Sequence, residues 1–381
     1  MGKRTYDWDP TSEEVLEDQA AAYDDLRRRC PVAHSELLGW SVFRHADVTK
    51  VLADPETFSN VVSTHRSVPN GLDPPEHGAY RAALEVHFSP ERLQSFEPSC
   101  RRLARDLLLS LPRGVEFDFI DAFAIPFAQK CQCAFLGWPE ELAVPVGRWT
   151  RRNREAILAA DRSALARIAT EFESWMSRLL EERRSAITPP DDVTCALMNV
   201  RVNGQPLTDQ ELSSVFRNWT VGEVGSMAAA AGILAAKIAS LPTLQRHLRE
   251  SPSEIPAAIE EVLRVEGPLV SNRRRVTRDV TLGGQHLTAG ERVSLMWMSA
   301  NRDENVFEEP ESVLIERDQR ANLLWGAGIH VCPGAPLARL QLRIALEGLL
   351  ASSSRITLGS AAPSRLVYPE NGWALLPLRF N

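Results

Sequence analysis

The sequence predicts a mainly α-helical protein with a minor β region, folded as one domain. Three observations predict this class. Apolar residues recur at helical spacing over most of the chain, alternation is limited to a short tract at 276–298, and no linker rich in glycine, serine or proline divides the 381 residues. The content of 44% hydrophobic and 24% charged residues is ordinary for a globular chain. We therefore expect a single domain over 1–381, with 1–11 flexible.

The first predicted elements are short. Residues 12–29 have a helical pattern, and 39–43 reads as a strand that leads into a helix over 46–52. That helix should end at Asp54 and Pro55, because proline lacks an amide N–H and restricts the residue before it. A small β region is therefore expected near the N-terminus.

The middle of the chain is predicted to be helical. Proline- and glycine-containing turns at 111–114 and 188–192 separate its long apolar-periodic stretches, which are 76–110, 119–136, 139–188 and 208–240. Further helices are expected at 255–264 and 335–350. Between them, the alternating tract 276–298 contains turns at 282–284 and 288–290, and this combination predicts hairpins.

Charge, hydropathy and cysteine spacing exclude several classes of protein. The net charge is −7 and lysine occurs at only four positions, so nucleic acid is not an expected partner. The apolar run at 227–236 is too short to span a bilayer and the N-terminus has no hydrophobic signal core, so we expect no membrane and a cytoplasmic location. Cys131 and Cys133 lack a second ligand pair, and we interpret them as buried helix residues rather than metal ligands.

The most specific motif is a glycine-rich loop that places Cys332 before the last predicted helix. Positions 325–334 read WGAGIHVCPG. The glycines permit a tight turn in which backbone approaches a flat ring, and the positive end of the following helix favours a thiolate. A lone cysteine is usually a small buried hydrophobe. An aromatic residue, then Gly-x-Gly-x-His-x-Cys-x-Gly, then Leu337-Ala338-Arg339, however, resembles the cysteine loop of the cytochrome P-450 superfamily of haem-thiolate monooxygenases.

This resemblance extends over 22–380 and is to the bacterial soluble type. It implies the family's single-domain fold, haem b (iron protoporphyrin IX) as cofactor and Cys332 as the iron ligand. It further implies that the haem propionates are bound by His77, Arg81, Arg274 and His330, since buried carboxylates need cationic partners. His77 and Arg81 are four residues apart and so share a helix face. Taken alone, they would more often be a solvated helix pair, and it is the combination with Cys332 that favours the haem.

Glu261 and Arg264 resemble the family's Glu-x-x-Arg pair, which braces the cysteine side of the fold. An acid and a base three residues apart on a helix are common by chance, so the motif depends on its position relative to Cys332. The family usually adds an arginine after the next Pro-Glu, where this chain has Ser312. The third member is then missing or relocated, with Arg317 as the candidate.

The chain departs from the family pattern where protons are delivered. Counting back from Glu261 puts Ser226 at the alcohol position and Gly225 at the position that normally holds an acid. Glu223 can share a helix face with Ser226, and we hypothesise that the two order water and pass protons. The alternative is that Glu223 faces solvent and Ser226 only packs. The resemblance also implies a substrate pocket shaped by the 61–71 loop and by Asn218, Val221, Leu269 and Val270.

Pro333 is a second departure. The residue after the ligand normally offers an N–H to the sulfur, and proline has none. Fewer donors leave more electron density on the sulfur, which predicts a lower iron reduction potential. The alternative is that proline only shapes the turn.

The 58–71 stretch and the helix with Glu223 are similar to haem domains of self-sufficient fusions that carry their own reductase. The sequence contains no such module, so we expect electrons from NAD(P)H through a reductase and a ferredoxin- or flavodoxin-type partner. Candidate contacts are Arg339, Arg343 and the arginines at 101–105, with a solvated arginine face as the alternative.

The activity implied by the resemblance is insertion of one oxygen atom from dioxygen into a small, mostly apolar organic substrate, by hydroxylation or O-dealkylation. Two alternatives stay open. One is a peroxygenase driven by hydrogen peroxide, which the altered acid position favours. The other is a haem-binding sensor or carrier without turnover.

Overall fold

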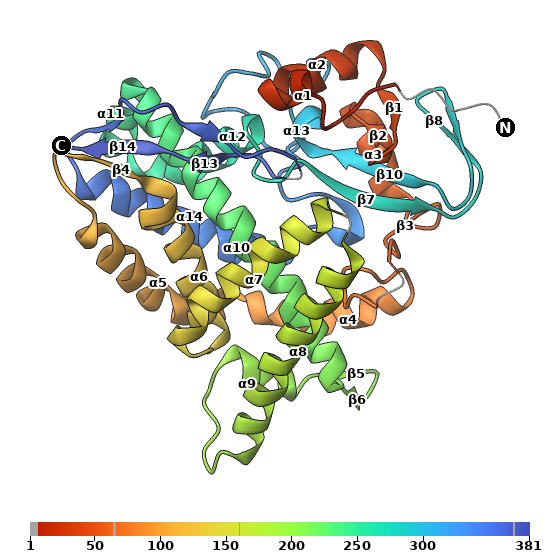
Figure 1. Cartoon of the computed structure of the whole chain (residues 1–381), viewed down its shortest axis with the longest axis horizontal. Coiled ribbons are helices and arrows are strands. Elements are labelled where there is room, and N and C mark those ends of the chain that lie inside the picture. The colour runs from red at the N-terminus through yellow and green to blue at the C-terminus, as the bar shows by residue number, and fades with distance from the viewer. Residues whose placement is uncertain (1–6, 64–65, 160, 369) are drawn as a thin grey trace.

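A helical body and a smaller β-rich part lie side by side, and the long helix α10 (Asp209–Ser240) runs through the helical body (Figure 1). The structure is a computed structural model that describes residues 7–63, 66–159, 161–368 and 370–381. Helices dominate, and the strands are short. The predicted class, mainly α with a minor β region in a single domain, is confirmed.

Helix α10 agrees with its predicted range of 208–240. Its N-terminus is fixed by a capping box, in which the Thr208 hydroxyl accepts from the Glu211 N–H and the Glu211 carboxylate accepts from the Thr208 N–H. Such caps contribute about 1 kcal/mol. By length and composition alone α10 could cross a membrane, but 67% of its most apolar window is buried inside the protein.

Three of the other predicted helices are interrupted where a capping side chain starts a new one, whereas those predicted at 255–264 and 335–350 are continuous. Ser89 accepts from the Arg92 N–H and begins a new helix at Pro90, which divides 76–110. Asp18 and Asp161 divide 12–29 and 139–188 in the same way. Helices α1 (Glu13–Glu17) and α2 (Gln19–Arg29) lie in the β-rich part. The helices and helical turns of the body are α4 (Glu76–Glu85), η1 (Val86–Phe88), α5 (Pro90–Ser110), η2 (Ile120–Ala124), α6 (Ile125–Leu136), η3 (Glu140–Leu142), α7 (Ala143–Leu158), α8 (Arg162–Ser185), α9 (Val193–Met198), α11 (Pro242–Glu250), η4 (Pro252–Glu254), α12 (Ile255–Val265) and α14 (Ala335–Ser352).

The largest sheet has five strands in the order β1-β2-β10-β7-β3. These are β1 (Val32–Ser35), β2 (Gly39–Val42), β3 (Phe58–Ser59), β7 (Ser271–Val276) and β10 (Arg292–Met296). The predicted strand at 39–43 and helix at 46–52 correspond to β2 and α3 (His45–Ala53). Strands β2 and β10 are parallel, although they are far apart in the chain, and all other pairs are antiparallel.

The hairpin tract was predicted too long. Strand β10 ends at Met296, and α13 (Trp297–Ala300) follows at once, so the strand character expected up to 298 is wrong there. One hairpin within the tract is present as β8 (Val280–Leu282) and β9 (Gln285–Leu287). Strands of two to four residues carry too little alternation to be recognised. Those that sequence reasoning missed include β4 (Glu116–Asp118), β5 (Arg201–Val202), β6 (Gln205–Pro206), β11 (Ile356–Leu358), β12 (Ser364–Arg365), β13 (Trp373–Leu375) and β14 (Pro377–Phe380).

The N-terminal segment was expected to be flexible over 1–11, and residues 1–6 of it lie outside the described part. Trp8 is buried, with its ring 6.0 Å from Tyr23 and 5.4 Å from Phe43. The segment thus joins the apolar cluster under the five-stranded sheet.

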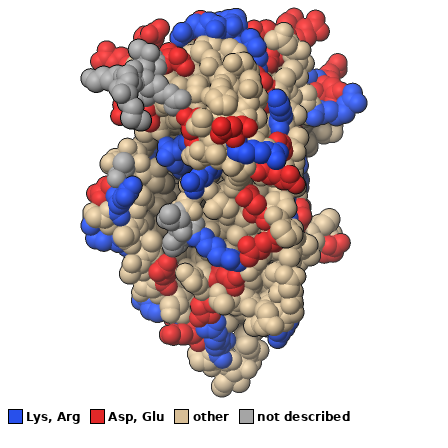
Figure 2. Space-filling view, turned by 90° about the vertical axis from the view of Figure 1, so that its right-hand side faces the viewer, with Lys and Arg blue, Asp and Glu red and all other residues tan. Residues whose placement is uncertain are grey.

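Figure 2 shows one face of the protein, on which acidic and basic side chains are interspersed. That face offers no broad surface of a single charge.

Candidate functional site

The cysteine loop holds Cys332 just before α14. Gly326 and Gly328 both have left-handed backbone angles, with φ of +70° and +71°. A Cβ at Gly328 would lie 2.6 Å from the carbonyl oxygen of Leu52, so glycine is required there. After the turn η5 (Gly328–His330), the Cys332 N–H donates to the Trp325 carbonyl at 2.8 Å and closes the loop.

The sulfur of Cys332 lies at the N-terminal end of α14. Burial raises the pKa of Cys332 above its ordinary value, and the charge of Glu223 raises it as well. The main-chain N–H groups of Gly334 and Ala335 and the charge of Arg81 oppose this shift. Pro333 lies between the cysteine and these two donors and has no N–H of its own. A bound cation would favour the deprotonated sulfur.

Four basic side chains from three segments converge beside this loop. His77 and Arg81 come from α4, Arg274 comes from β7 and His330 comes from η5. The rings of His77 and His330 are 4.1 Å apart. Burial, together with the charges of His77, Arg274 and Arg81, lowers the pKa of His330 to about 3. The predicted propionate-binding residues are therefore brought together.

Among the described residues, Asp73 is the carboxylate whose charge acts on both His77 and Arg274 of this basic cluster. Arg274 is 7% exposed, burial lowers its pKa to about 10, and its hydrogen bond goes to the Arg273 carbonyl. His330 Nε2 is buried without a hydrogen-bond partner among the described residues. Arg81 reaches Glu85 at 3.3 Å. Buried cations and an unpartnered donor fit a ligand that carries two carboxylates, as the propionates of haem do.

The Glu261–Arg264 pair is completely buried. The two side chains form a two-pronged ion pair with both N···O distances at 2.9 Å. Arg317 Nε also donates to Glu261 at 2.8 Å. The third member of the network, absent at Ser312, is thus supplied by Arg317. Arg264 in turn donates to the carbonyls of Asn301, Pro310 and Ser312, which fixes the segment leading to the cysteine loop.

The two candidate proton-handling residues of α10 have different surroundings. The Ser226 hydroxyl donates to the Gly222 carbonyl at 2.5 Å, and no hydrogen bond joins it to Glu223 among the described residues. Burial raises the pKa of Glu223 to about 7, opposed by the nearby amide of Gln341 in α14. Glu223 Oε1 is buried without a hydrogen-bond partner in the described structure. Glu223 is therefore inside the protein rather than in solvent.

The predicted pocket residues divide into two groups. Val221 and Leu269 are 42% and 39% exposed, so both side chains are accessible to a ligand, as lining a pocket requires. Val270 is fully buried in the cluster that contains Met296 and Met298. The expectation that Val270 lines the pocket is therefore wrong for this structure, because the side chain next to exposed Leu269 turns into the core.

The 61–71 loop is braced to α10 and to itself, except that its residues 64–65 lie outside the described part. Asn218 donates to the Val68 carbonyl at 2.8 Å, and the Val68 N–H donates to Ser214 Oγ at 2.9 Å. At the other end, the Asn60 N–H donates to Asp73 at 2.9 Å. Asn218 thus acts as an anchor for the loop that covers the candidate pocket.

One residue at this site was missed by sequence reasoning. Glu370, from the segment between β12 and β13, forms a β-bridge with Leu269 and lies against Gly225 of α10. Arg154 of α7 pairs with it at 2.5 Å. No motif connects these four residues, because each comes from a different part of the chain.

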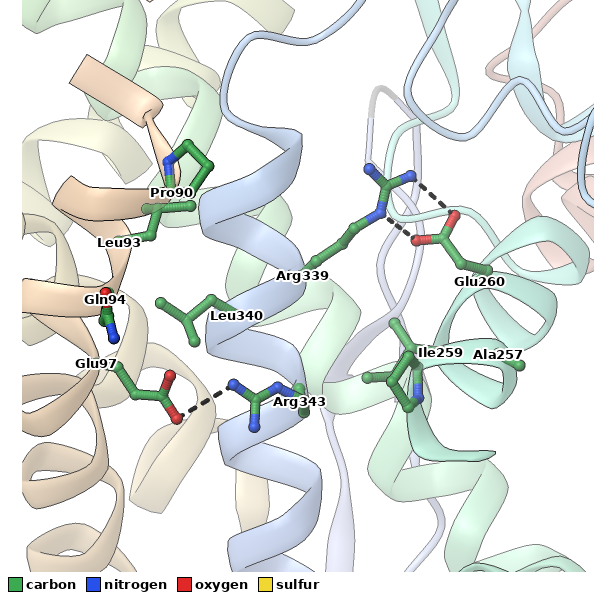
Figure 3. A pocket seen from close by; sticks show the side chains of 11 residues that line it. Pro90, Leu93, Gln94, Glu97, Ala257, Ile259, Glu260, Arg339, Leu340 and Arg343 are labelled. Atoms are coloured by element: carbon green, nitrogen blue, oxygen red, sulfur yellow. Dashed lines mark hydrogen bonds and ion pairs between the residues drawn. The ribbon is translucent and has the colours of Figure 1, made fainter. Parts of the chain in front are cut away.

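A hollow of about 490 Å³ lies on the cysteine side between α5, α12 and α14. Figure 3 shows the Arg339 side chain facing Glu260 and the Arg343 side chain facing Glu97. The distances are 2.7 Å and 3.2 Å. The arginines expected to contact a redox partner therefore already have carboxylate partners, and Arg101 likewise pairs with Glu97 and Glu347.

Comparison with known proteins gives consistent matches. The family model described as "Cytochrome P450" matches residues 154–354. Cyclomarin C epoxidase CymV of Salinispora arenicola is 32% identical over 87% of this chain and 88% of that protein. Erythromycin C-12 hydroxylase of Saccharopolyspora erythraea is 30% identical over 90% of each. The solved structure of cytochrome P450 CYP109Q5 from Chondromyces apiculatus superposes with a TM-score of 0.88, at 30% identity over 98% of both chains.

Proposed function

This chain belongs to the cytochrome P450 family of haem-dependent monooxygenases, and we propose that it hydroxylates or O-dealkylates a small, mostly apolar organic molecule. For hydroxylation the balance is RH + O2 + NAD(P)H + H⁺ → ROH + H2O + NAD(P)⁺. The family uses haem b and receives electrons from NAD(P)H through partner proteins. The relatives differ in the molecules they act on, and those substrates are not assigned to this chain.

The observation that supports the proposal best is the basic cluster beside the cysteine loop. Cys332 would bind the iron, and His77, Arg81, Arg274 and His330 would bind the propionates. The bound haem supplies dioxygen activation, with the thiolate favouring O–O cleavage. The protein positions the group, keeps its carboxylates paired and shields it from bulk water.

We assign the substrate to the space beside α10. Val221 and Leu269 offer apolar contact there, and Asn218 holds the covering loop in place. The Ser226 hydroxyl donates to the Gly222 carbonyl and can still accept a hydrogen bond from water. Glu223, with a pKa of about 7, can both accept and release a proton near neutral pH.

We assign the electron donor to the cysteine side, at the hollow between α5, α12 and α14 (Figure 3). Its rim combines apolar side chains with the Arg339–Glu260 and Arg343–Glu97 pairs. A ferredoxin or flavodoxin with acidic side chains would exchange partners with these arginines. Electron delivery by a separate ferredoxin or flavodoxin fits a cytoplasmic enzyme. The similarity of 58–71, and of the helix with Glu223, to the haem domains of self-sufficient reductase fusions stays a prediction from the sequence.

The carbon-monoxide difference spectrum of the reduced protein tests the proposal. A thiolate-type band is expected, and Cys332→Ala should abolish it, whereas Cys195→Ala, at a half-buried cysteine away from the site, should keep it. A substrate screen by spin-state shift, followed by consumption of NAD(P)H with a redox partner, then tests turnover. A band and ligand shifts without any consumption would support the sensor or carrier alternative and contradict the proposed activity.

The second candidate function is a peroxygenase, and Gly225 is the observation that favours it, since this glycine leaves the acid position of α10 without a side chain. Product formation with hydrogen peroxide but none with any reductase system would support it. Product formation with a reductase system, and little with peroxide, is the outcome that we expect.

A further inference from the structure

A carboxylate from the C-terminal part of the chain occupies the space that a side chain at Gly225 would fill. A Cβ at Gly225 would lie 3.2 Å from Glu370 Oε1 and 3.9 Å from Glu370 Cδ. Gly225 precedes Ser226, whose hydroxyl is the one proposed to exchange hydrogen bonds with water. Glu370 therefore lies where an acid beside Ser226 would be, although it belongs to a different segment.

The position of Glu370 is fixed from two sides. Its backbone forms an antiparallel bridge with Leu269, which lines the candidate pocket. Two residues later, Gly372 has a φ of +123°, and a Cβ there would meet the Cβ of Ala229 at 3.3 Å, so this segment lies close against the next turn of α10. Only a glycine allows that approach.

The carboxylate itself is held by Arg154. Arg154 Nη1 donates to Glu370 Oε2 at 2.5 Å, and the two side chains are 30% and 20% exposed. The pair uses one carboxylate oxygen, so Oε1 is the oxygen next to Gly225. Arg154 belongs to α7, which packs against α10 (Figure 1). The ion pair thus connects α7 to the C-terminal segment above the pocket.

We propose that Glu370 supplies the distal carboxylate that α10 lacks at Gly225, positioning water and transferring protons toward Ser226. This inference rests on the proposed monooxygenase function. Each turnover consumes two protons and two electrons per dioxygen, and the electrons come from NAD(P)H through the redox partner. Glu370 gives a proton to a water beside Ser226 and regains one from solvent through its exposed edge, so it is unchanged over the cycle.

Glu223 is the competing carboxylate, and it faces a different part of the site. It is near Gln341 of α14, and its charge acts on Cys131 in α6 and on Cys332. Glu370 instead adjoins Gly225, the residue before Ser226, and forms a bridge with Leu269. No hydrogen bond joins Glu223 to Ser226 among the described residues, so we assign water positioning at Ser226 to Glu370 and leave Glu223 as a proton carrier on the side of α10 that faces α14.

The test compares Glu370→Gln with the wild type in the haem-loaded full-length protein. The amide keeps the shape and removes the charge. We expect the carbon-monoxide band and substrate binding to remain, turnover to fall about tenfold or more, as for loss of a general acid–base group, and most reducing equivalents to be released as hydrogen peroxide. The substrate-free ferric spectrum should also shift toward high spin, because water is held less well.

Rescue separates this role from a structural one. In Glu370→Ala, which empties this space, the added substitution Gly225→Asp places a carboxylate there from the helix, and we expect product per NAD(P)H and the ferric spectrum to recover at least partly relative to Glu370→Ala alone. Glu266→Gln is the matched control. Glu266 is also 20% exposed and also paired, with Lys237 at 2.6 Å and Arg365 at 2.9 Å, and its substitution should leave both readouts unchanged.

Other outcomes overturn the inference. If Glu370→Gln keeps the wild-type ratio of product to NAD(P)H, Glu370 does not have this role. If only Glu223→Gln lowers that ratio strongly, the role belongs to Glu223. If Glu370→Gln does not hold haem, Arg154→Gln carries the test, since it frees the carboxylate without removing it, and unchanged coupling there counts against us. A wild-type protein without the carbon-monoxide band would instead contradict the proposed function itself.

Discussion

The Arg317 guanidinium donates at 2.8 Å to the same Glu261 oxygen that accepts from Arg264 at 2.9 Å. Two arginines therefore share one fully buried carboxylate. Its lone pairs are further occupied by Gln319 and by the Leu314 N–H. This network joins α12 to the segment that precedes the cysteine loop.

Removal of Arg317 should destabilise the fold. Arg317→Ala leaves part of a buried negative charge uncompensated, and such losses cost about 3 kcal/mol or more. The measurement is the free energy of unfolding by urea. Arg320→Ala is the control, since Arg320 is 91% exposed and pairs with Asp318 at the surface, where the cost is about 0.5 kcal/mol or less. Equal effects of the two substitutions would show that Arg317 is not part of the buried network.

The stability of the apoprotein should depend on pH through Glu223. Its folded-state pKa of about 7 lies above the ordinary value of 4.5, so the folded chain binds more protons between these values. Stability is then fully present below about pH 4.5 and is lost as the pH rises through 7, by at most about 3 kcal/mol. Glu223→Gln should flatten this decline in a series of unfolding curves from pH 5 to pH 8. Glu181→Gln, on the exposed side of α8, should not alter it.

An N–H restored next to the sulfur should raise the reduction potential. In the present sequence Cys332 accepts from Gly334 and Ala335 but not from residue 333. Pro333→Leu adds one donor, and about 1 kcal/mol of extra stabilisation of the more electron-rich state corresponds to roughly 50 mV for one electron. Spectroelectrochemical titration of the haem-loaded protein measures the shift. A potential that stays the same would mean that proline only shapes the turn.

Electron transfer should depend on Arg339 more than on an arginine elsewhere. Arg339→Gln removes a cation at the hollow on the cysteine side, so the apparent KM for a reduced ferredoxin should rise several-fold at low salt and less at high salt. Arg152→Gln is matched in environment, since Arg152 is 48% exposed and paired with Glu171 at 2.6 Å, compared with 50% and 2.7 Å to Glu260 for Arg339. If both variants change the KM equally, the partner does not dock at the hollow.

Residue patterns in the sequence predicted those parts of the site that depend on local spacing. The loop around Cys332, the pair His77 and Arg81, and the length of α10 all follow from short-range motifs. The convergence of Arg274 and His330 came from the family resemblance, and the structure brings them together. The parallel pairing of β2 with β10 could not be predicted, because it depends on packing between distant segments.

The sequence does not indicate toward which side a given side chain points or which distant segment it contacts. Val270 adjoins exposed Leu269 but is enclosed in the core, and a one-residue change of face cannot be read from a single short strand. Glu370 meets Gly225 only because Gly372 lets the C-terminal segment approach Ala229. Neither contact leaves a periodic or motif-like signal in the chain.

The bracing of the 61–71 loop has a consequence for how this enzyme would adapt to new substrates. A larger molecule beside α10 cannot simply push the loop outward, because it would have to stretch the Asn218–Val68 and Val68–Ser214 hydrogen bonds. Breaking directional bonds carries an enthalpic cost that loose apolar packing would not. Substitution of Asn218 by an apolar residue should therefore allow the pocket to accept larger ligands. The lost hydrogen bond should weaken the discrimination between ligands of different size and leave the stability of the fold unchanged.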